Sequence, residues 1–351
     1  MPYDDTHRPG RGRPAGPARA ALALTALATA AALTTGCSGP GGVDLGDDWQ
    51  GSTTFALARV DGLVTVVGIN PAAGHAQSLA VVPQQEDDTD AISPHIVRLA
   101  DGRWLLSVPR ADGRPDRRYT LDRADQTLDG LPEGESLRRT LPGRTLVAEV
   151  GGLPEAGGTS SVLVKDPADW STERDVRIPG TIAHAASDPA SDTICLSNGT
   201  GVYTAALTDG RTTPVAVPKD LTVKDLACPA GRPVVVGAPA KDTAGEVGAA
   251  LTRTPAATLV SVTGGRVDAV AATKDTIVIA AAHGGATDLV ELDAATGRER
   301  HRATLDALPA SLGITPTEAG WLVYAEDTVT RVDLATGATE RFDLPGTLLD
   351  S

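Results

Sequence analysis

A strand-and-turn unit recurs along the chain at intervals of about forty residues, and only a few architectures accommodate such a repeat. Residues 288–297 (DLVELDAATG) are echoed by residues 327–337 (DTVTRVDLATG), so that the two Thr-Gly pairs stand forty residues apart. Each unit predicts a strand that enters a tight turn, where glycine adopts positive φ without steric cost. Weaker copies end near residues 125, 169, 209 and 252, and a turn at residues 84–85 would begin the series.

Short apolar runs dominate the rest of the chain, which shows almost no helical periodicity. Glycine, proline and aspartate separate these runs, which lie at residues 55–60, 63–69, 78–82, 104–108, 145–150 and 161–164. Such a pattern is typical of a sandwich, a barrel or a propeller. Turns spaced by 40–45 residues favour an all-β fold over residues 53–351, a single β-propeller of about seven four-stranded blades, although six or eight blades also fit the spacing.

The order of the strands predicts how the ring of blades closes. We expect residues 55–60 to begin the first blade and residues 340–344 to finish the last. The alternative is that an early strand completes the C-terminal blade, and the sequence does not decide between these two closures.

Two of the turns resemble those of quinoprotein-like (PQQ-repeat) propellers, whose units carry Asp, two further residues, Thr-Gly and then Trp. Residues 293–297 (DAATG) and 333–337 (DLATG) match the first half of this pattern, whereas His301 and Arg341 stand where the tryptophan would be. The resemblance implies a propeller. It does not carry over the quinone cofactor, because a shared fold does not imply a shared activity.

The N-terminus has the pattern of an export signal over residues 1–36. Four arginines precede an apolar run at residues 20–33, which is too short to span a bilayer but has the length of a signal-peptide core. Residues 33–37 (LTTGC) resemble the lipobox of bacterial lipoproteins, with Thr34 where that motif usually has leucine. The resemblance implies acylation of Cys37 with palmitate-like chains, after which Cys37 is the new N-terminus. The alternative is an ordinary secretory signal that contains a cysteine.

The two remaining cysteines, Cys195 and Cys228, agree with an exported protein. An even pair in an oxidising compartment predicts a disulfide. Two buried free thiols are the alternative. Residues 37–52 are rich in glycine and predict a flexible tether.

Charge and composition limit the partners. Without residues 1–36 the chain loses four arginines and two aspartates, which leaves a net charge of −16. This balance argues against nucleic acid as a partner. Aromatic residues make up 3% of the chain, too few for extended stacking platforms. The preference for arginine over lysine and the abundance of alanine are typical of a GC-rich, actinobacterial genome.

The sequence contains no recognisable catalytic set. No two histidines of the body stand three or four residues apart, and the nucleophile-elbow, phosphate-loop and dinucleotide motifs are missing. We therefore predict no catalytic, cofactor-binding or metal-binding residues. The acidic run at residues 86–90 has no glycine after it, as a calcium loop would require, and predicts a solvated loop. His184 and His283 stand near the ends of apolar strands and are candidates for lining the central channel, although half-buried structural histidines would look the same.

These features together predict a protein anchored through Cys37 to the extracytoplasmic face of the cell membrane. We expect it to act as a non-catalytic binding or scaffold protein for another envelope protein or an extracellular ligand. The alternative is a degenerate propeller enzyme, either a quinoprotein-like oxidoreductase or a hydrolase or lyase, with its site at the central channel.

Overall fold

The computed structural model describes residues 42–83, 94–110, 114–135, 138–151, 158–217, 221–239, 246–253, 256–263, 266–306 and 312–351. At residues 238–239, 246–253, 256–263, 283 and 312 it describes the backbone alone. The acidic run at residues 86–90 and Cys37 lie outside these ranges. None of the described residues belongs to a helix long and apolar enough to cross a membrane.

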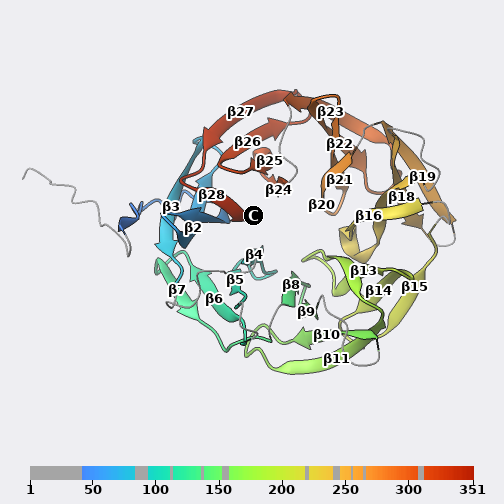
Figure 1. Cartoon of the computed structure of the whole chain (residues 1–351), viewed down its shortest axis with the longest axis horizontal. Helices are drawn as coiled ribbons and strands as arrows, with labels where there is room; N and C mark the ends of the chain where they lie inside the picture. The colour runs from blue at the N-terminus through green and yellow to red at the C-terminus, as the bar shows by residue number, and fades with distance from the viewer. Residues whose placement is uncertain are drawn as a thin grey trace, which may run out of the picture. The chain divides into compact units, whose positions relative to one another are not determined.

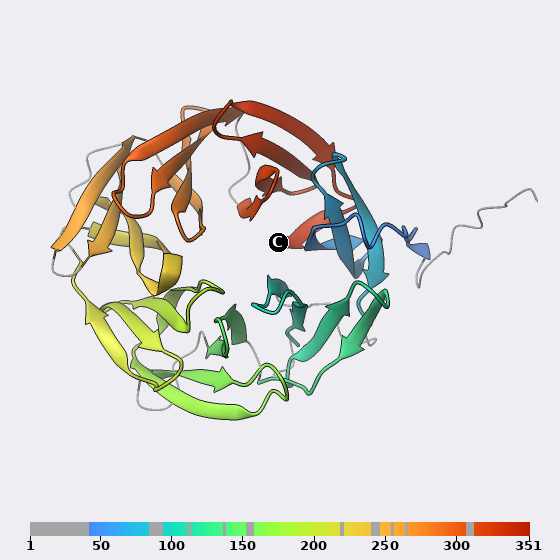
Figure 2. The same cartoon turned by 180° about the vertical axis from the view of Figure 1, so that it is seen from behind.

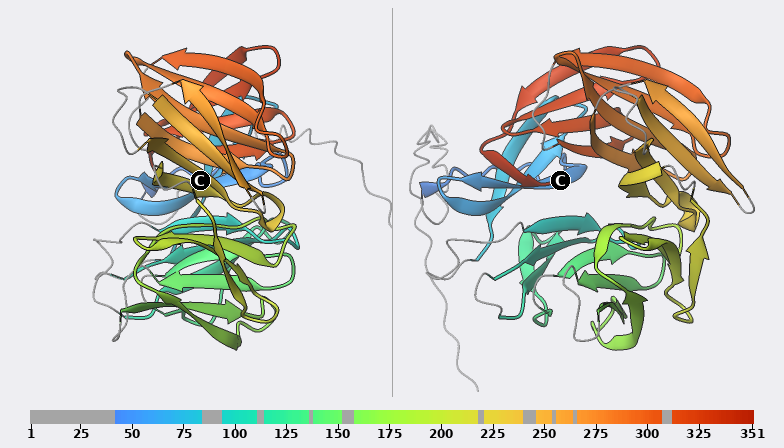
Figure 3. Two further views of the ribbon diagram at one scale, coloured as in Figure 1. Left: turned by 90° about the vertical axis from the view of Figure 1, so that its right-hand side faces the viewer. Right: turned by 45° about the vertical axis from the view of Figure 1, so that its right-hand side comes forward.

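Seven four-stranded antiparallel sheets follow one another around a ring, and the predicted all-β propeller with seven blades is confirmed (Figure 1). The innermost strand of each sheet lies near the axis of the ring and the outermost strand at its rim, as the view from behind also shows (Figure 2). Figure 3 shows the ring from two further sides, with each blade beside the next.

The strands of each blade are given from the axis to the rim. Blade 1 contains β28 (Thr347–Asp350), β1 (Thr54–Val60), β2 (Leu63–Asn70) and β3 (His75–Val81). Blade 2 contains β4 (His95–Arg98), β5 (Trp104–Val108), β6 (Arg117–Asp122) and β7 (Thr127–Gly130). Blade 3 contains β8 (Arg138–Pro142), β9 (Val147–Gly151), β10 (Thr159–Lys165) and β11 (Thr172–Pro179). Blade 4 contains β12 (Ile182–Ala186), β13 (Thr193–Asn198), β14 (Gly201–Ala206) and β15 (Thr212–Val215).

The remaining blades follow the same order. Blade 5 contains β16 (Leu221–Ala227), β17 (Val234–Pro239), β18 (Glu246–Arg253) and β19 (Ala256–Thr263). Blade 6 contains β20 (Arg266–Ala272), β21 (Thr276–His283), β22 (Ala286–Asp293) and β23 (Glu299–Asp306). Blade 7 contains β24 (Leu312–Thr317), β25 (Gly320–Ala325), β26 (Thr328–Asp333) and β27 (Ala338–Asp343). A single turn of 3₁₀ helix, η2 (Pro229–Gly231), follows β16.

The repeated turn joins the third strand of a blade to the fourth. In blade 6, Oδ1 of Asp293 accepts hydrogen bonds from the amides of Ala295 and Thr296, and Gly297 ends the turn at φ 71°. A left-handed residue stands at the same place in six blades: Gly74, Gln126, Trp170, Gly210, Gly297 and Gly337. The predicted first turn at residues 84–85 lies outside the described residues, and the matching turn of blade 1 is at residues 70–74.

Closure of the ring differs from both predicted arrangements. β1 is the second strand of blade 1, and β28, from the end of the chain, supplies the innermost strand beside it. β27 does finish blade 7, as expected, but the chain then continues into blade 1. A Cβ at Gly313 of β24 would collide with Oγ of Ser351, so this glycine allows the end of the chain to pass close to blade 7. Pairing of the two chain ends within one sheet leaves no gap in the ring.

The hydrophobic core is divided among the seven interfaces between neighbouring blades. The interfaces of blades 1 and 2 and of blades 3 and 4 contain the largest clusters of buried apolar side chains. Among the described side chains, the cluster between blades 2 and 3 has four buried members: Leu99, Leu105, Val147 and Trp170. The cluster between blades 4 and 5 has five, which include Cys195 and Cys228. These two interfaces therefore depend on more than apolar burial.

The chain before β1 packs against blade 1 from Val43 onward, in contrast to the flexible tether expected up to residue 52. Val43 is 0% and Trp49 is 4% exposed, and each belongs to an inter-blade cluster. The amide of Gly46 donates to the carbonyl of Ser78 at 2.8 Å, and the guanidinium of Arg123 donates to the carbonyl of Trp49 at 3.3 Å. The apolar side chains within this glycine-rich stretch account for the packing.

Candidate functional site

Five polar side chains come from the innermost strands of five consecutive blades, and we call them the axis belt. Its members are Asp350 of β28, His95 of β4, Arg139 of β8, His184 of β12 and Asp225 of β16. The innermost strands lie nearest the axis of the ring (Figure 1). Five of the innermost strands therefore each contribute one of these ionisable groups.

Two members of the belt hold neighbouring blades together. Oδ2 of Asp350 accepts a hydrogen bond from the amide of Ile96 at 2.8 Å, which joins blade 1 to blade 2. Burial raises the pKa of Asp350 to about 6, despite this hydrogen bond and the positive charge of Arg139. Nε2 of His95 accepts a hydrogen bond from the amide of Thr140 at 3.0 Å, which joins blade 2 to blade 3.

The hydrogen bond to Nε2 determines which ring nitrogen of His95 carries the proton. Burial, and then the positive charges of Arg139 and Arg118, lower the pKa of His95 to about 4. The imidazole is therefore neutral near pH 7 and carries its proton on Nδ1, because Nε2 is the acceptor. His95 can donate one hydrogen bond to a ligand but has no free lone pair on the ring with which to act as a base.

His184 and Asp225 face each other between blades 4 and 5. Nδ1 of His184 lies 3.8 Å from Oδ1 of Asp225, beyond the reach of a hydrogen bond. Oδ1 of Asp225 accepts the amide of Leu226 at 2.7 Å. Burial raises the pKa of Asp225 above its ordinary value, and the Leu226 amide and the charges of His184 and Arg139 oppose this shift. Their side chains are 30% and 35% exposed, so solvent reaches both groups.

Arg139 is a positive charge that acts on three other members of the belt. It is exposed, and its charge lowers the pKa values of His95, Asp225 and Asp350. Among the described residues, however, no hydrogen bond or ion pair holds its guanidinium. The preceding residue, Arg138, differs, because it binds the carboxylate of Glu135. Arg139 therefore has donors available for a ligand.

The structure describes some of the predicted site residues and not others. The disulfide between Cys195 and Cys228 is confirmed, and it joins β13 of blade 4 to the end of β16 in blade 5. His184 lies on an innermost strand, whereas His283 ends β21, the second strand of blade 6. The side chain of His283 and all of Cys37 lie outside the description, so their predicted roles stay predictions.

Sequence reasoning did not find the other four members of the belt, which share no linear motif. A positional signal exists nevertheless. Four belt residues follow the left-handed residue of the preceding repeated turn by thirteen to fifteen positions: Arg139 after Gln126, His184 after Trp170, Asp225 after Gly210 and Asp350 after Gly337. This signal is useful only when one knows which strand of the blade each part of the repeat forms. It is the position within the blade that brings these residues to the axis.

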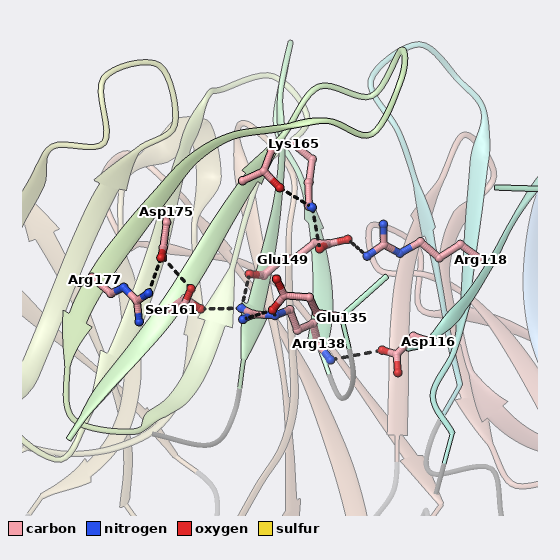
Figure 4. Close-up of polar contacts among 10 residues, drawn as sticks. Asp116, Arg118, Glu135, Arg138, Glu149, Ser161, Lys165, Asp175 and Arg177 are labelled. Atoms are coloured by element: carbon pink, nitrogen blue, oxygen red, sulfur yellow. Dashed lines mark hydrogen bonds and ion pairs between the residues drawn. The ribbon is translucent and has the colours of Figure 1, made fainter. Parts of the chain in front are cut away.

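A second charged cluster lies between blades 2 and 3, where the apolar cluster is smallest (Figure 4). Glu149 of β9 is buried and forms an ion pair with Arg118 of β6, while Nζ of Lys165 lies 3.9 Å from its other oxygen. Burial raises the pKa of Glu149, and the charges of Arg118 and Lys165 oppose that shift. Arg118 also lies over the ring of Trp170, 5.4 Å from its centroid.

This second cluster is not accessible to a ligand. The side chains of Glu149 and Arg118 are 1% and 3% exposed. The network continues outward through Arg138, which donates to the carbonyl of Ser161 at 2.9 Å (Figure 4). We therefore assign it to the joining of two blades, where it supplements the few apolar contacts. In the described part of the chain, no three His, Cys, Asp or Glu side chains are grouped as a metal site would require.

Comparisons with known proteins agree on the fold. No protein-family model matches the sequence. No curated protein matches it either. Among solved structures, "a putative 6-phosphogluconolactonase" from Bacteroides uniformis is 13% identical with a TM-score of 0.59, and the match covers 84% of this chain and 97% of that one. Apo AztD from Citrobacter koseri is 12% identical with a TM-score of 0.56, over 84% and 95% of the two chains.

The WD40 domain of Pan2 from Neurospora crassa is a third similar structure. It is 11% identical with a TM-score of 0.54, and the match covers 77% of this chain and 85% of that domain. At such low identity the likeness establishes the propeller fold and carries no activity from one protein to another.

Proposed function

We propose that this chain is a lipid-anchored, non-catalytic binding protein on the extracytoplasmic face of an actinobacterial cell membrane. The observation that carries the proposal is the axis belt. It offers solvent-reached polar groups, and one of them, Arg139, has donors without a partner in the described structure. A rigid ring that presents such groups is suited to holding a ligand or partner.

The geometry of the two belt histidines favours binding over catalysis. Nucleophilic catalysis needs a hydroxyl or thiol hydrogen-bonded to a base that is itself oriented by a third group. Nε2 of His95 is occupied by a backbone amide, and Nδ1 of His184 lies 3.8 Å from its carboxylate neighbour. Within the described ranges, no serine, threonine or cysteine side chain is hydrogen-bonded to either ring.

The N-terminal segment would keep an anchored ring close to the membrane. If Cys37 is acylated, only residues 38–42 separate it from Val43, where packing against blade 1 begins. That stretch spans at most about 20 Å when fully extended. The disulfide between Cys195 and Cys228 supports an oxidising compartment outside the cytoplasm.

Fractionation and crosslinking in cells test this function together. We expect the wild-type protein in the detergent phase of membrane extracts and the Cys37→Ser protein in the medium. We also expect in-cell crosslinking of the anchored form, followed by mass spectrometry, to recover a dominant envelope partner that the Cys37→Ser control does not recover. Equal partition of the two forms into the soluble fraction would refute the anchor, and background proteins alone would refute the scaffold role.

A propeller enzyme is the second candidate function, and the pair of His184 and Asp225 is what favours it. A partly exposed carboxylate whose pKa is raised by burial, beside an imidazole, is a common arrangement for general acid–base catalysis. This candidate predicts turnover of an ester, lactone or glycoside that Asp225→Asn abolishes while binding is kept. The quinoprotein-like form predicts a quinone-dependent oxidation. Absence of turnover across such a panel would remove this candidate.

A further inference from the structure

The outermost strand of each blade has one edge that faces no further strand of its own sheet. Such an edge presents backbone N–H and C=O groups that can pair with another chain. Natural proteins protect these edges with charged side chains, proline, a short strand or a covering segment. The seven outermost strands differ in this protection, and they are β3, β7, β11, β15, β19, β23 and β27.

Six of these edges are protected. The chain before β1 lies along β3, where the amide of Gly46 donates to the carbonyl of Ser78 at 2.8 Å. β7 and β15 are each four residues long, and β15 contains Pro214. The other three each carry several charged side chains: Glu173, Arg174, Asp175 and Arg177 on β11, Glu299, Arg300, Arg302 and Asp306 on β23, and Glu340, Arg341 and Asp343 on β27.

β19 of blade 5 has none of these protections. Its eight residues (AATLVSVT) include no charged residue and no proline. Four of them are β-branched, which favours an extended strand. β18 pairs with β19 over its whole length without a bulge, so the backbone of β19 is regular. Within the described ranges, no segment pairs with its other edge, which lies at the rim of the ring (Figure 1).

The free edge of β19 supplies the groups that a further strand needs. In an antiparallel sheet, alternate residues direct their N–H and C=O groups to opposite sides of the strand. β18 is bonded to one set of these groups on β19. The other set points toward the rim along a strand about 26 Å long. An added antiparallel strand could therefore form hydrogen bonds along all of β19.

The lack of charge on β19 favours a second copy of this chain as the added strand. The chain carries a net charge of −14, so two copies repel one another at long range. Like charges directly opposite one another in paired strands are also destabilising, and β19 paired with its own copy brings none together. A different partner of so acidic a protein would gain specificity from complementary charges, and β19 offers it none.

We propose that β19 pairs antiparallel with β19 of a second copy and so forms a dimer. A two-fold axis perpendicular to the sheet places the two copies of blade 5 side by side, and their four-stranded sheets become continuous. Because each copy uses the same edge, the contact closes at two copies and does not propagate. This inference goes beyond the proposed function, since it depends neither on the axis belt nor on Cys37.

Sedimentation velocity of purified Cys37→Ser protein, in which residues 42–351 are unchanged, tests the proposal. We expect a reversible equilibrium between monomer and dimer as the protein concentration rises. Thr258→Lys places a charge on β19 and should raise the dissociation constant of the dimer by about tenfold or more. Thr339→Lys makes the same change at an exposed position of β27 and should leave that constant unchanged.

A second variant covers the case in which Thr258→Lys does not fold. Ser261→Lys places the charge on the opposite face of the same strand, because successive side chains alternate between the faces. It should weaken the dimer to a similar extent. Far-ultraviolet circular dichroism of each monomer shows whether the variant keeps its fold.

Cysteine crosslinking locates the contact. Cys195 and Cys228 are bonded to each other, so a single cysteine introduced on the Cys37→Ser background is the only free thiol of the chain. Substitutions made one at a time, from Thr258→Cys to Val262→Cys, should crosslink two copies most readily at the position nearest the two-fold axis. Crosslinking should decline on either side of that position, because a disulfide forms only between closely opposed residues. Thr339→Cys on β27 is the control and should crosslink slowly.

Four results would overturn the inference. They are a monomer at every concentration, a dimer that the lysine variants of β19 leave as tight as Thr339→Lys does, equal crosslinking on β19 and β27, and a foreign protein bound to β19 of a monomeric ring. None of them bears on ligand binding at the axis belt or on anchoring through Cys37. The dimer and the proposed function can therefore fail separately.

Discussion

Replacement of Asp350 by asparagine is predicted to stabilise the ring near neutral pH. Asp350 ends β28, the strand that closes blade 1, and its Oδ2 accepts the amide of Ile96 at 2.8 Å. Burial raises its pKa from 3.8 to about 6. The ionised carboxylate is therefore less favourable in the folded protein than in the unfolded chain. Asparagine keeps an oxygen acceptor for Ile96 and removes the charge.

The sign and size of the effect follow from the two pKa values. Because the folded pKa is the higher one, the favourable contribution of Asp350 is complete below pH 3.8 and is lost as the pH rises through 6. A shift from 3.8 to about 6 corresponds to about 3 kcal/mol. Asp350→Asn should therefore raise the free energy of unfolding by up to about 3 kcal/mol at pH 7.5 and by less than about 1 kcal/mol at pH 4.

Urea unfolding of both proteins at pH 4 and pH 7.5, on the Cys37→Ser background, measures this difference. Asp343→Asn removes an exposed carboxylate from β27 and should leave the free energy of unfolding nearly unchanged at either pH. If Asp350→Asn is less stable than the parent protein at pH 7.5, then attraction to Arg139 and the hydrogen bond from Ile96 outweigh the cost of burial, and the reasoning is refuted.

Three further predictions concern the joints between blades and the N-terminal segment. Glu149→Leu leaves the charge of Arg118 buried without its partner, so urea unfolding should show a loss of about 3–5 kcal/mol in the free energy of unfolding. The double variant with Arg118→Met should lose less than the sum of the two single variants, and additive losses would contradict the pairing. Replacing Cys195 and Cys228 by serine opens a loop of 33 residues and should cost about 3–4 kcal/mol, a loss that a reducing agent should reproduce only in the parent protein. Trp49→Ala should cost about 3–5 kcal/mol and expose the chain before β1 to limited proteolysis; a cleavage pattern identical to that of the parent would show that the packing is not stabilising.

The candidate site illustrates how far sequence reasoning reaches in a propeller. His184 was found because it stands near the end of an apolar segment, and the structure places it within β12, an innermost strand. Arg139, Asp225 and Asp350 have unremarkable neighbours in the sequence, and each lies on a different blade. Their association depends on the closure of the ring, so no local pattern could have brought them together. Only a correct assignment of each repeat to the strands of a blade would have shown that all three lie on innermost strands.

The sequence alone identified the repeated unit and predicted about seven blades and a disulfide between Cys195 and Cys228, and the structure confirms both predictions. The turns depend on contacts within five residues, as in the hydrogen bonds from Oδ1 of Asp293 to nearby amides, and such local interactions leave a readable pattern. Only the tertiary structure decided which strand closes the ring and which residues form the axis belt. The contact between Ile96 and Asp350 joins positions 254 residues apart, and nothing local encodes a partner at that distance. The axis belt exists because the ring closes.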